Sequence, residues 1–262
     1  MWIFLDSQDF ERFKDDLLLV FHSHSLVVHA FCIMNNHLHL FVETPLGNLS
    51  KAMHRLFSRY AAYYKKKYNY KGKVFEKRYT AYLVETELYA LDLTRYIHRN
   101  PVDVIVSDPL SWQHSSYRIY QGLSEKPDFM DLDLVLKRFD NQEKQAVSKM
   151  KEHMFRDESS QWYPEDYILG NTILGSNSFL ERIRDKIPAG DQNELSGLTL
   201  LNEDHKITKI QEYLSKQSLS LEQKRDLFVY AVRKRTSVAV KKINQILGTK
   251  LDRHSIYYRI KK

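Results

Sequence analysis

The chain has 262 residues and 43% hydrophobic content, which suits a globular protein that buries a substantial core in more than one unit. No apolar run is long enough to span a membrane and no secretory signal opens the sequence, so we expect a cytoplasmic protein with no membrane partner. A single cysteine, Cys32, excludes an internal disulfide framework, and its apolar surroundings predict a buried thiol.

The whole chain has a net charge of +7. Its positive charge is concentrated in two parts. Residues 1–120 carry 15 basic and 12 acidic side chains, residues 121–219 carry 13 and 18, and residues 220–262 carry 12 and 3. Within the first part, residues 49–80 hold ten Lys or Arg and one acid. Two basic regions separated by an acidic one indicate two surfaces for nucleic acid, although either region alone would also fit a solvated face.

The first elements are predicted to be a helix and a β-hairpin. Leu26 to Met34 is an apolar run typical of a buried strand, Asn35-Asn36 is a turn signal, and His37 to Glu43 is the next strand. Before them, Ser7 is placed to cap a helix whose apolar side consists of Phe10, Phe13, Leu17 and Phe21.

His37 and His39 form the most informative pair in this part of the sequence. Alternation along a strand places both imidazoles on the same face, spaced to bind one divalent metal. Most such pairs in strands are structural, so the metal interpretation depends on the residues around them.

A basic helix follows the β-hairpin. Apolar residues at helical spacing run from Leu49 to Tyr64, the lysines at 65–67 and the segment around Gly72 are predicted as a loop, and a strand is predicted within residues 74–84. The tyrosines here can stack unpaired bases, although some must be core. The candidate phosphate contacts are Lys51, Arg55, Arg59, Lys65, Lys66, Lys67, Lys73, Lys77 and Arg78.

The next helix, predicted from Glu87 to about Asn100 with Thr86 as its cap and Pro101 after its end, carries a candidate nucleophile. Tyr96 and Asn100 lie four residues apart and therefore share a face. A tyrosine close to a bound metal is what metal-assisted phosphodiester cleavage requires, while a packing aromatic is the alternative for Tyr96. His98 and Arg99 flank this position, either to contact phosphate or to face solvent.

The rest of the chain reads as a connector and a second DNA-binding block. Residues 121–219 are predicted to be a helical connector with little chemistry of its own. Residues 220–262 contain three short predicted helices and strong positive charge, which favours a helix-turn-helix over a small helical bundle. The fold class predicted from these elements is α+β, an antiparallel sheet with helices, in three parts: 1–120, 121–219 and 220–262.

Four segments occur in an order that is similar to a known family: Ala30–Glu43, Gly72–Tyr79, Arg95–Val102 and Trp112–Tyr117. They resemble the motifs of single-tyrosine HUH (histidine–hydrophobic–histidine) transposases, most closely the REP-associated tyrosine transposase branch, over roughly residues 3–120. The resemblance implies a ferredoxin-like HUH nuclease core. It also implies a DNA transposase that cleaves single-stranded or hairpin DNA with a tyrosine, forms a 5′-phosphotyrosine and rejoins the strands.

Carried over by position, the resemblance makes Tyr96 the catalytic nucleophile and His37 and His39 metal ligands. Asn100 takes the third-ligand position, where related transposases have a glutamine. These ligands suit Mg²⁺ or Mn²⁺. Resealing through a phosphotyrosine needs no ATP, which agrees with the lack of a nucleotide-binding motif. A monomer and a homodimer remain open.

Two further features come from such resemblances. The C-terminal block resembles the DNA-binding domain of bacterial replication initiators, which implies base contacts by Arg253, His254 and Ser255. Family members begin with a strand before the equivalent of Ile3–Asp6, and that first strand is missing here, so we expect a misassigned start or a truncated remnant. Each buried backbone group left unpaired would cost about 1–3 kcal/mol. The alternatives are an impaired remnant that acts as a sequence-specific DNA-binding protein and an RNA-hairpin binder.

Overall fold

The chain forms two compact units in a computed structural model, and each is described by itself. The first consists of Met1–Thr80 and Leu91–Ser160, and the second of Ala81–Ala90 and Gln161–Lys262. The predicted helix-turn-helix, with Arg253, His254 and Ser255, lies outside the described residues. The structure describes residues 2–102, 104–156, 162–169, 172–184, 211 and 214–215.

Helix α1 (Ser7–Ser23) begins one residue earlier than the sequence predicted. Asp6, rather than Ser7, is the N-cap, and its carboxylate accepts the Asp9 backbone N–H at 3.1 Å. The Asp9 carboxylate in turn accepts the Asp6 N–H, so the pair forms a capping box. The predicted apolar side of the helix is confirmed, because Phe10, Phe13, Leu17 and Phe21 are all buried.

The predicted β-hairpin is confirmed: β1 (Val27–Ile33) pairs antiparallel with β2 (Leu38–Glu43). Cys32 lies opposite His39 in this register. The register shifts between Val28 and Ala30, which makes a β-bulge. Cys32 is buried as predicted, and burial raises the pKa of its thiol to about 12.

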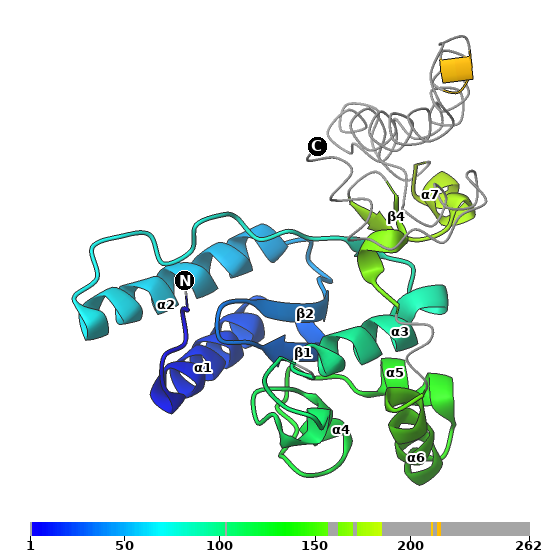
Figure 1. Ribbon diagram of the computed structural model, residues 1–262, viewed down its shortest axis with the longest axis horizontal. Coiled ribbons are helices and arrows are strands. Elements are labelled where there is room, and N and C mark those ends of the chain that lie inside the picture. Colours follow the sequence, from blue (N-terminus) through cyan, green and yellow to red (C-terminus); the bar gives the residue numbers. More distant parts are fainter. Residues whose placement is uncertain are drawn as a thin grey trace. The chain divides into compact units, whose positions relative to one another are not determined.

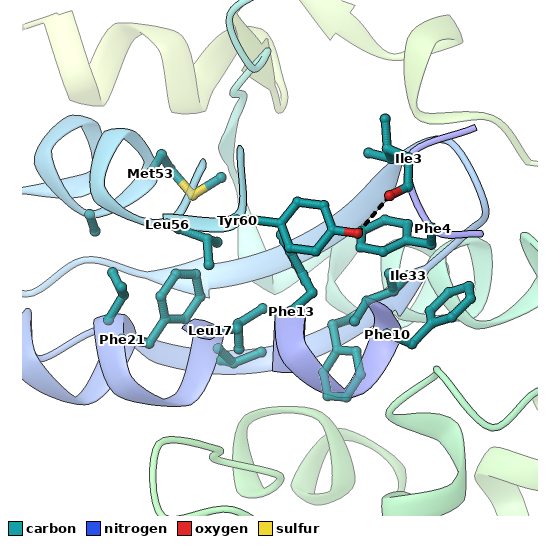
Figure 2. Close-up of a cluster of buried hydrophobic side chains, with 14 of the residues drawn as sticks. Ile3, Phe4, Phe10, Phe13, Leu17, Phe21, Ile33, Met53, Leu56 and Tyr60 are labelled. Carbon is teal, nitrogen blue, oxygen red and sulfur yellow. Dashed lines mark hydrogen bonds between the residues drawn. The ribbon is translucent and has the colours of Figure 1, made fainter. Parts of the chain in front are cut away.

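Helix α1 and helix α2 (Leu49–Tyr68) pack against each other and against one face of the β-hairpin (Figures 1 and 2). The interface is aromatic: the Tyr60 ring lies 5.1 Å from that of Phe4 and 5.2 Å from that of Phe13. The Tyr60 hydroxyl donates to the Ile3 carbonyl at 2.6 Å, which ties the N-terminal segment to α2 (Figure 2).

The outer edge of β1 is paired by segments from later in the sequence. Phe31 donates its N–H to Ser116 Oγ at 2.8 Å and accepts the Ser116 N–H at 3.0 Å, and Ile33 donates to the His114 carbonyl at 2.9 Å. Further along, Val28 donates to the Phe129 carbonyl at 2.9 Å. In the described part of the chain this sheet has two strands, so β2 carries no strand on its other edge.

Helix α2 extends beyond its predicted end, because residues 65–67 form its last turn rather than a loop. Asn69 ends the helix in the left-handed conformation, with φ of 47°. Lys67 is held by the carboxylates of Asp6 and Asp9 at 2.8 Å each. The lysine run continues the helix because one of its members pairs with the N-terminal segment.

The later part of the first unit is helical, through α4 (Tyr117–Tyr120), α5 (Asp133–Phe139) and α6 (Glu143–Met154). Helices α5 and α6 pack side by side (Figure 1). Their apolar faces share a core with α4. The helical character predicted for this stretch is therefore observed up to Met154, while the predicted boundaries at 120 and 219 stay predictions.

The described part of the second unit contains three short strands in the order β3-β5-β4, of which β4 is labelled in Figure 1. They are β3 (Leu83–Val84), β4 (Ile168–Leu169) and β5 (Ile173–Leu174), followed by α7 (Asn177–Arg184). The strand predicted within residues 74–84 is thus limited to its last two residues. Together the described elements show the predicted α+β class, and no described helix has the length and apolar character to cross a membrane.

Candidate functional site

His39 lies on the face of β2 that points away from the α1/α2 core, and His37 directly precedes the strand. The residues between and beyond them, Leu38 and Leu40, pack against that core, so alternation directs both imidazoles to the opposite side. Their ring centroids are 5.0 Å apart and the rings are nearly perpendicular. The two imidazoles therefore lie next to each other on one side of the β-hairpin, as the alternation predicted.

The His37 ring is oriented by its neighbour in the turn. Its Nδ1 lies 2.7 Å from Asn36 Oδ1, an acceptor, so Nδ1 carries the proton and donates. Nε2 is then the ring nitrogen that a neutral His37 could offer to a metal. A metal-binding histidine typically has its second nitrogen held by such a hydrogen bond.

Helix α3 (Thr86–Arg99) brings Tyr96 and Asn100 to the histidines. The Tyr96 ring centroid lies 5.5 Å from that of His39, edge to face. Asn100, the residue after the helix, donates from Nδ2 to the Tyr96 carbonyl at 3.2 Å and makes a side-chain hydrogen bond with His39. Burial and the neighbouring His37 lower the pKa of His39 to about 4, although the bond with Asn100 opposes them.

His37 and His39 offer imidazole nitrogens and Asn100 an amide oxygen, which are atom types that divalent metals accept as ligands. Metal ligands must be unprotonated, and His39 is neutral at neutral pH. Among the described residues, no group of three or more His, Cys, Asp or Glu side chains is arranged to hold a metal ion. Asn100, which is hydrogen-bonded to His39, is a neighbouring side chain with an oxygen that could complete such a ligand set.

The face of α3 beside Tyr96 is attached to α6. Arg95 donates to the His153 carbonyl at 2.9 Å and to the Arg156 carbonyl at 3.1 Å, while Arg99 donates to the Met154 carbonyl at 3.0 Å. These carbonyls are at or just beyond the C-terminal end of α6, where backbone acceptors lack helical partners. The sequence left Arg99 open between phosphate and solvent, and in the structure its half-buried guanidinium also bonds to the backbone of α6.

His98 is buried, so neither phosphate contact nor exposure to solvent applies to it. Its Nε2 lies 2.7 Å from the hydroxyl oxygen of Ser116, which is also buried. Burial lowers the pKa of His98 to about 3, so the ring is neutral. Sequence reasoning missed this contact because nothing in the sequence indicates that two positions 18 residues apart meet.

Most of the candidate phosphate contacts are exposed as predicted. Arg78 also donates to Ser50 Oγ at 2.9 Å. The exposed side chains are Lys51, Arg55, Lys65, Lys66, Lys73, Lys77 and Arg78.

Arg59 and Lys67 already have carboxylate partners within the protein. Arg59 Nε lies 2.7 Å from the buried carboxylate of Asp16, and Lys67 is held by two aspartates as described above. A DNA phosphate would have to compete with these ion pairs. Of the candidate stacking tyrosines, Tyr60 and Tyr64 are buried in the core.

Residues 4–100 match the family model described as transposase IS200 like. The matched stretch, which is less than half of the chain, is similar to IS200-like transposases and includes His37, His39, Tyr96 and Asn100. No curated protein matches the chain, and no solved structure matches it.

Proposed function

We propose that this protein is a DNA transposase that cleaves and rejoins single-stranded or hairpin DNA through a 5′-phosphotyrosine on Tyr96. The observation that supports it is the approach of the Tyr96 ring to the His39 ring, at 5.5 Å, with His37 beside it. His37 and His39 are more than 50 residues from Tyr96 in the sequence, yet the three side chains lie close together, and this chemistry uses such a combination. The match of residues 4–100 to IS200-like transposases supports the same activity.

The reaction exchanges one phosphodiester for another. The Tyr96 oxygen forms a bond to phosphorus, the bond from phosphorus to the 3′ oxygen breaks, and the proton lost by the phenol is balanced by the one gained by the released 3′ hydroxyl. The strand with the 5′ phosphate stays on Tyr96, and attack by a 3′ hydroxyl reverses the step. The number of phosphodiester bonds is unchanged, so the rejoining step requires no nucleotide cofactor.

His37, His39 and Asn100 would hold the metal, which we propose is Mg²⁺ or Mn²⁺. When bound, the metal would polarise the scissile phosphate and neutralise charge on it. The protein itself contributes the position of Tyr96, the fixed tautomer of His37 and the neutral state of His39. A phenol has a pKa near 10 and is a weak nucleophile at neutral pH, which is why charge neutralisation is needed.

The exposed basic residues of α2 and of the segment after it are proposed to hold the DNA backbone. The finer parts of the proposal are the REP-associated branch, the ferredoxin-like core and the C-terminal helix-turn-helix with Arg253, His254 and Ser255. A monomer or a homodimer fits the proposal equally.

Covalent capture on a denaturing gel tests the proposal. The protein is incubated with labelled single-stranded hairpins from the DNA that flanks its gene, with Mn²⁺, Mg²⁺ or a chelator. We expect a metal-dependent adduct that Tyr96→Phe abolishes. Tyr89→Phe, which removes a phenol hydroxyl two turns earlier in the same helix, is the matched control and should keep the adduct.

Two results would contradict the proposal. An adduct that persists in Tyr96→Phe would assign the chemistry to another residue. DNA that is bound but never cut would favour the non-catalytic DNA-binding alternative, and tight binding of RNA hairpins in preference to DNA would favour the RNA-binding one.

A further inference from the structure

We propose that His98 and Ser116 are positioning residues that hold helix α3 on strand β1, so that Tyr96 already lies against His39 before DNA binds. The inference rests on the proposed function for its catalytic consequence. Its structural part, that this contact holds α3 in place, is separate and is tested separately below.

We call the contact of His98, Ser116 and Phe31 the junction, and the Ser116 hydroxyl lies at its centre. It accepts the Phe31 N–H at 2.8 Å, lies 3.2 Å from the Phe31 carbonyl and lies 2.7 Å from His98 Nε2. A hydroxyl has one proton and two lone pairs. When it donates to the Phe31 carbonyl and accepts the Phe31 N–H, one lone pair remains, so Nε2–H of His98 is the matching donor.

The junction is closed to solvent. His98 and Ser116 are each 0% exposed, and Phe31 is 8% exposed. A serine and a histidine at 2.7 Å resemble a nucleophile and its base, but no substrate can reach a fully buried pair. The same burial makes the bond hard to replace, because a group that loses its partner there has no water to bond with.

The junction connects the two halves of the candidate site. Phe31 is next to Cys32, which is the register partner of His39 across the β-hairpin. His98 is two residues beyond Tyr96 on α3, about 200° further around the helix axis. Because the two side chains leave the helix on nearly opposite sides, rolling α3 about its axis cannot move Tyr96 without also straining the His98–Ser116 bond.

The arginines of α3 supply a second attachment. Arg95 and Arg99 hold the helix to the C-terminal end of α6, on a side different from those of Tyr96 and His98. Helix α3 is therefore fixed to β1 and to α6 while a third side presents Tyr96. A displacement of about 1 Å between reacting groups can reduce a rate about 100-fold, so such fixing has a catalytic consequence.

The test compares two neighbouring buried serines. Ser116→Ala removes the hydroxyl that bonds to His98, whereas Ser115→Ala removes a hydroxyl that accepts the Tyr117 N–H and donates weakly to the same Phe31 carbonyl at 3.5 Å, with no hydrogen bond to a described residue of α3. For each variant we would measure the single-turnover rate of adduct formation at saturating DNA and Mn²⁺, the Kd for DNA, and amide hydrogen exchange in α3, all corrected for the folded fraction.

We expect Ser116→Ala to reduce the adduct rate about 10- to 100-fold with a Kd within about twofold of wild type, and to increase exchange in α3. Ser115→Ala should leave the rate within about twofold and α3 protected. Equal rates and equal α3 exchange in the two variants would overturn the inference. If wild type makes no adduct, the proposed function fails, and the exchange measurement alone still decides whether the junction holds α3.

A second pair of variants covers the case in which Ser116→Ala does not fold. His98→Gln keeps a side-chain N–H donor, and His98→Leu keeps the volume without a donor. The inference requires that His98→Gln retain more of the adduct rate and more α3 protection than His98→Leu. Identical behaviour of the two folded variants would refute it.

Discussion

The two faces of the β-hairpin differ in what they require of their side chains. On one face, Phe31 and Leu40 contribute to an apolar core with α1 and α2. On the other, His39 meets Tyr96, and the nearby His98 bonds to Ser116. Side chains alternate along a strand, so these environments are separated by a single residue.

The two faces differ in how strictly they fix the positions of their side-chain atoms. The apolar face is stabilised by buried area and close packing, which many arrangements of similar volume can provide. The chemistry of the polar face requires specific pairs of atoms to lie at specific distances from each other. Substitutions on the first face should therefore change stability, and substitutions on the second should change the rate of chemistry.

The largest expected effect compares neighbours on opposite faces of β2. His39→Ala should reduce the adduct rate by about 100-fold or more, because it removes a proposed metal ligand, with little loss of stability. Leu40→Ala should keep the rate per folded molecule and reduce the free energy of unfolding by about 1–3 kcal/mol. Single-turnover kinetics and urea unfolding measure the two quantities, and the reverse pattern would remove the distinction between the faces.

Leu56→Ala tests the apolar core at a fully buried position, because Leu56 is 0% exposed. We expect the free energy of unfolding to fall by about 2–5 kcal/mol through lost transfer energy and a cavity. Leu56→Met, which conserves volume, is the control and should cost less than about 1.5 kcal/mol in urea unfolding. A Leu56→Ala loss no larger than that of the control would show that this core is loosely packed.

Arg59 and Arg55 lie one turn apart on α2 and sharpen the comparison for charged groups. Arg59→Gln should cost about 1–2 kcal/mol of stability, because it removes a charged hydrogen bond at 2.7 Å to the buried Asp16. Arg55→Gln should leave stability within about 0.5 kcal/mol and lower the salt dependence of DNA binding by about one unit of slope. Fluorescence anisotropy at several salt concentrations would show whether Arg59 binds DNA after all.

The smallest expected effect is a dependence of stability on pH that originates at Asp9. Burial raises the pKa of this carboxyl, but hydrogen bonds from Lys67, the Leu5 amide and two tyrosines outweigh burial and leave the pKa below its ordinary value of 3.8. The carboxylate thus stabilises the fold above that value, and the contribution is lost as the pH falls through the lower, folded pKa. Unfolding free energies between about pH 2 and 5 should vary less in Asp9→Asn than in wild type; an equal variation would place the effect elsewhere.

Local sequence patterns identified the elements whose signals are short-range. The apolar spacing of α1 and the alternation in β2 follow from interactions between residues close in sequence, and they placed His37 and His39 on one face correctly. The prediction of Ser7 as the N-cap was wrong, because Asp6 forms a reciprocal capping box with Asp9. The sequence pattern is compatible with this cap as well. The lysines at 65–67 were wrongly predicted as a loop because a distant ion pair supports that turn of the helix.

The sequence by itself therefore determined the α+β class, the paired imidazoles and the shared face of Tyr96 and Asn100, because each depends on a helical or strand repeat. Only the tertiary structure decided that Tyr96 meets His39, that His98 is buried against Ser116 and that α6 holds the arginines of α3. These contacts join residues far apart in the chain, and which of them form depends on how whole elements pack. No local pattern contains that information, since the partners share neither a helix nor a strand.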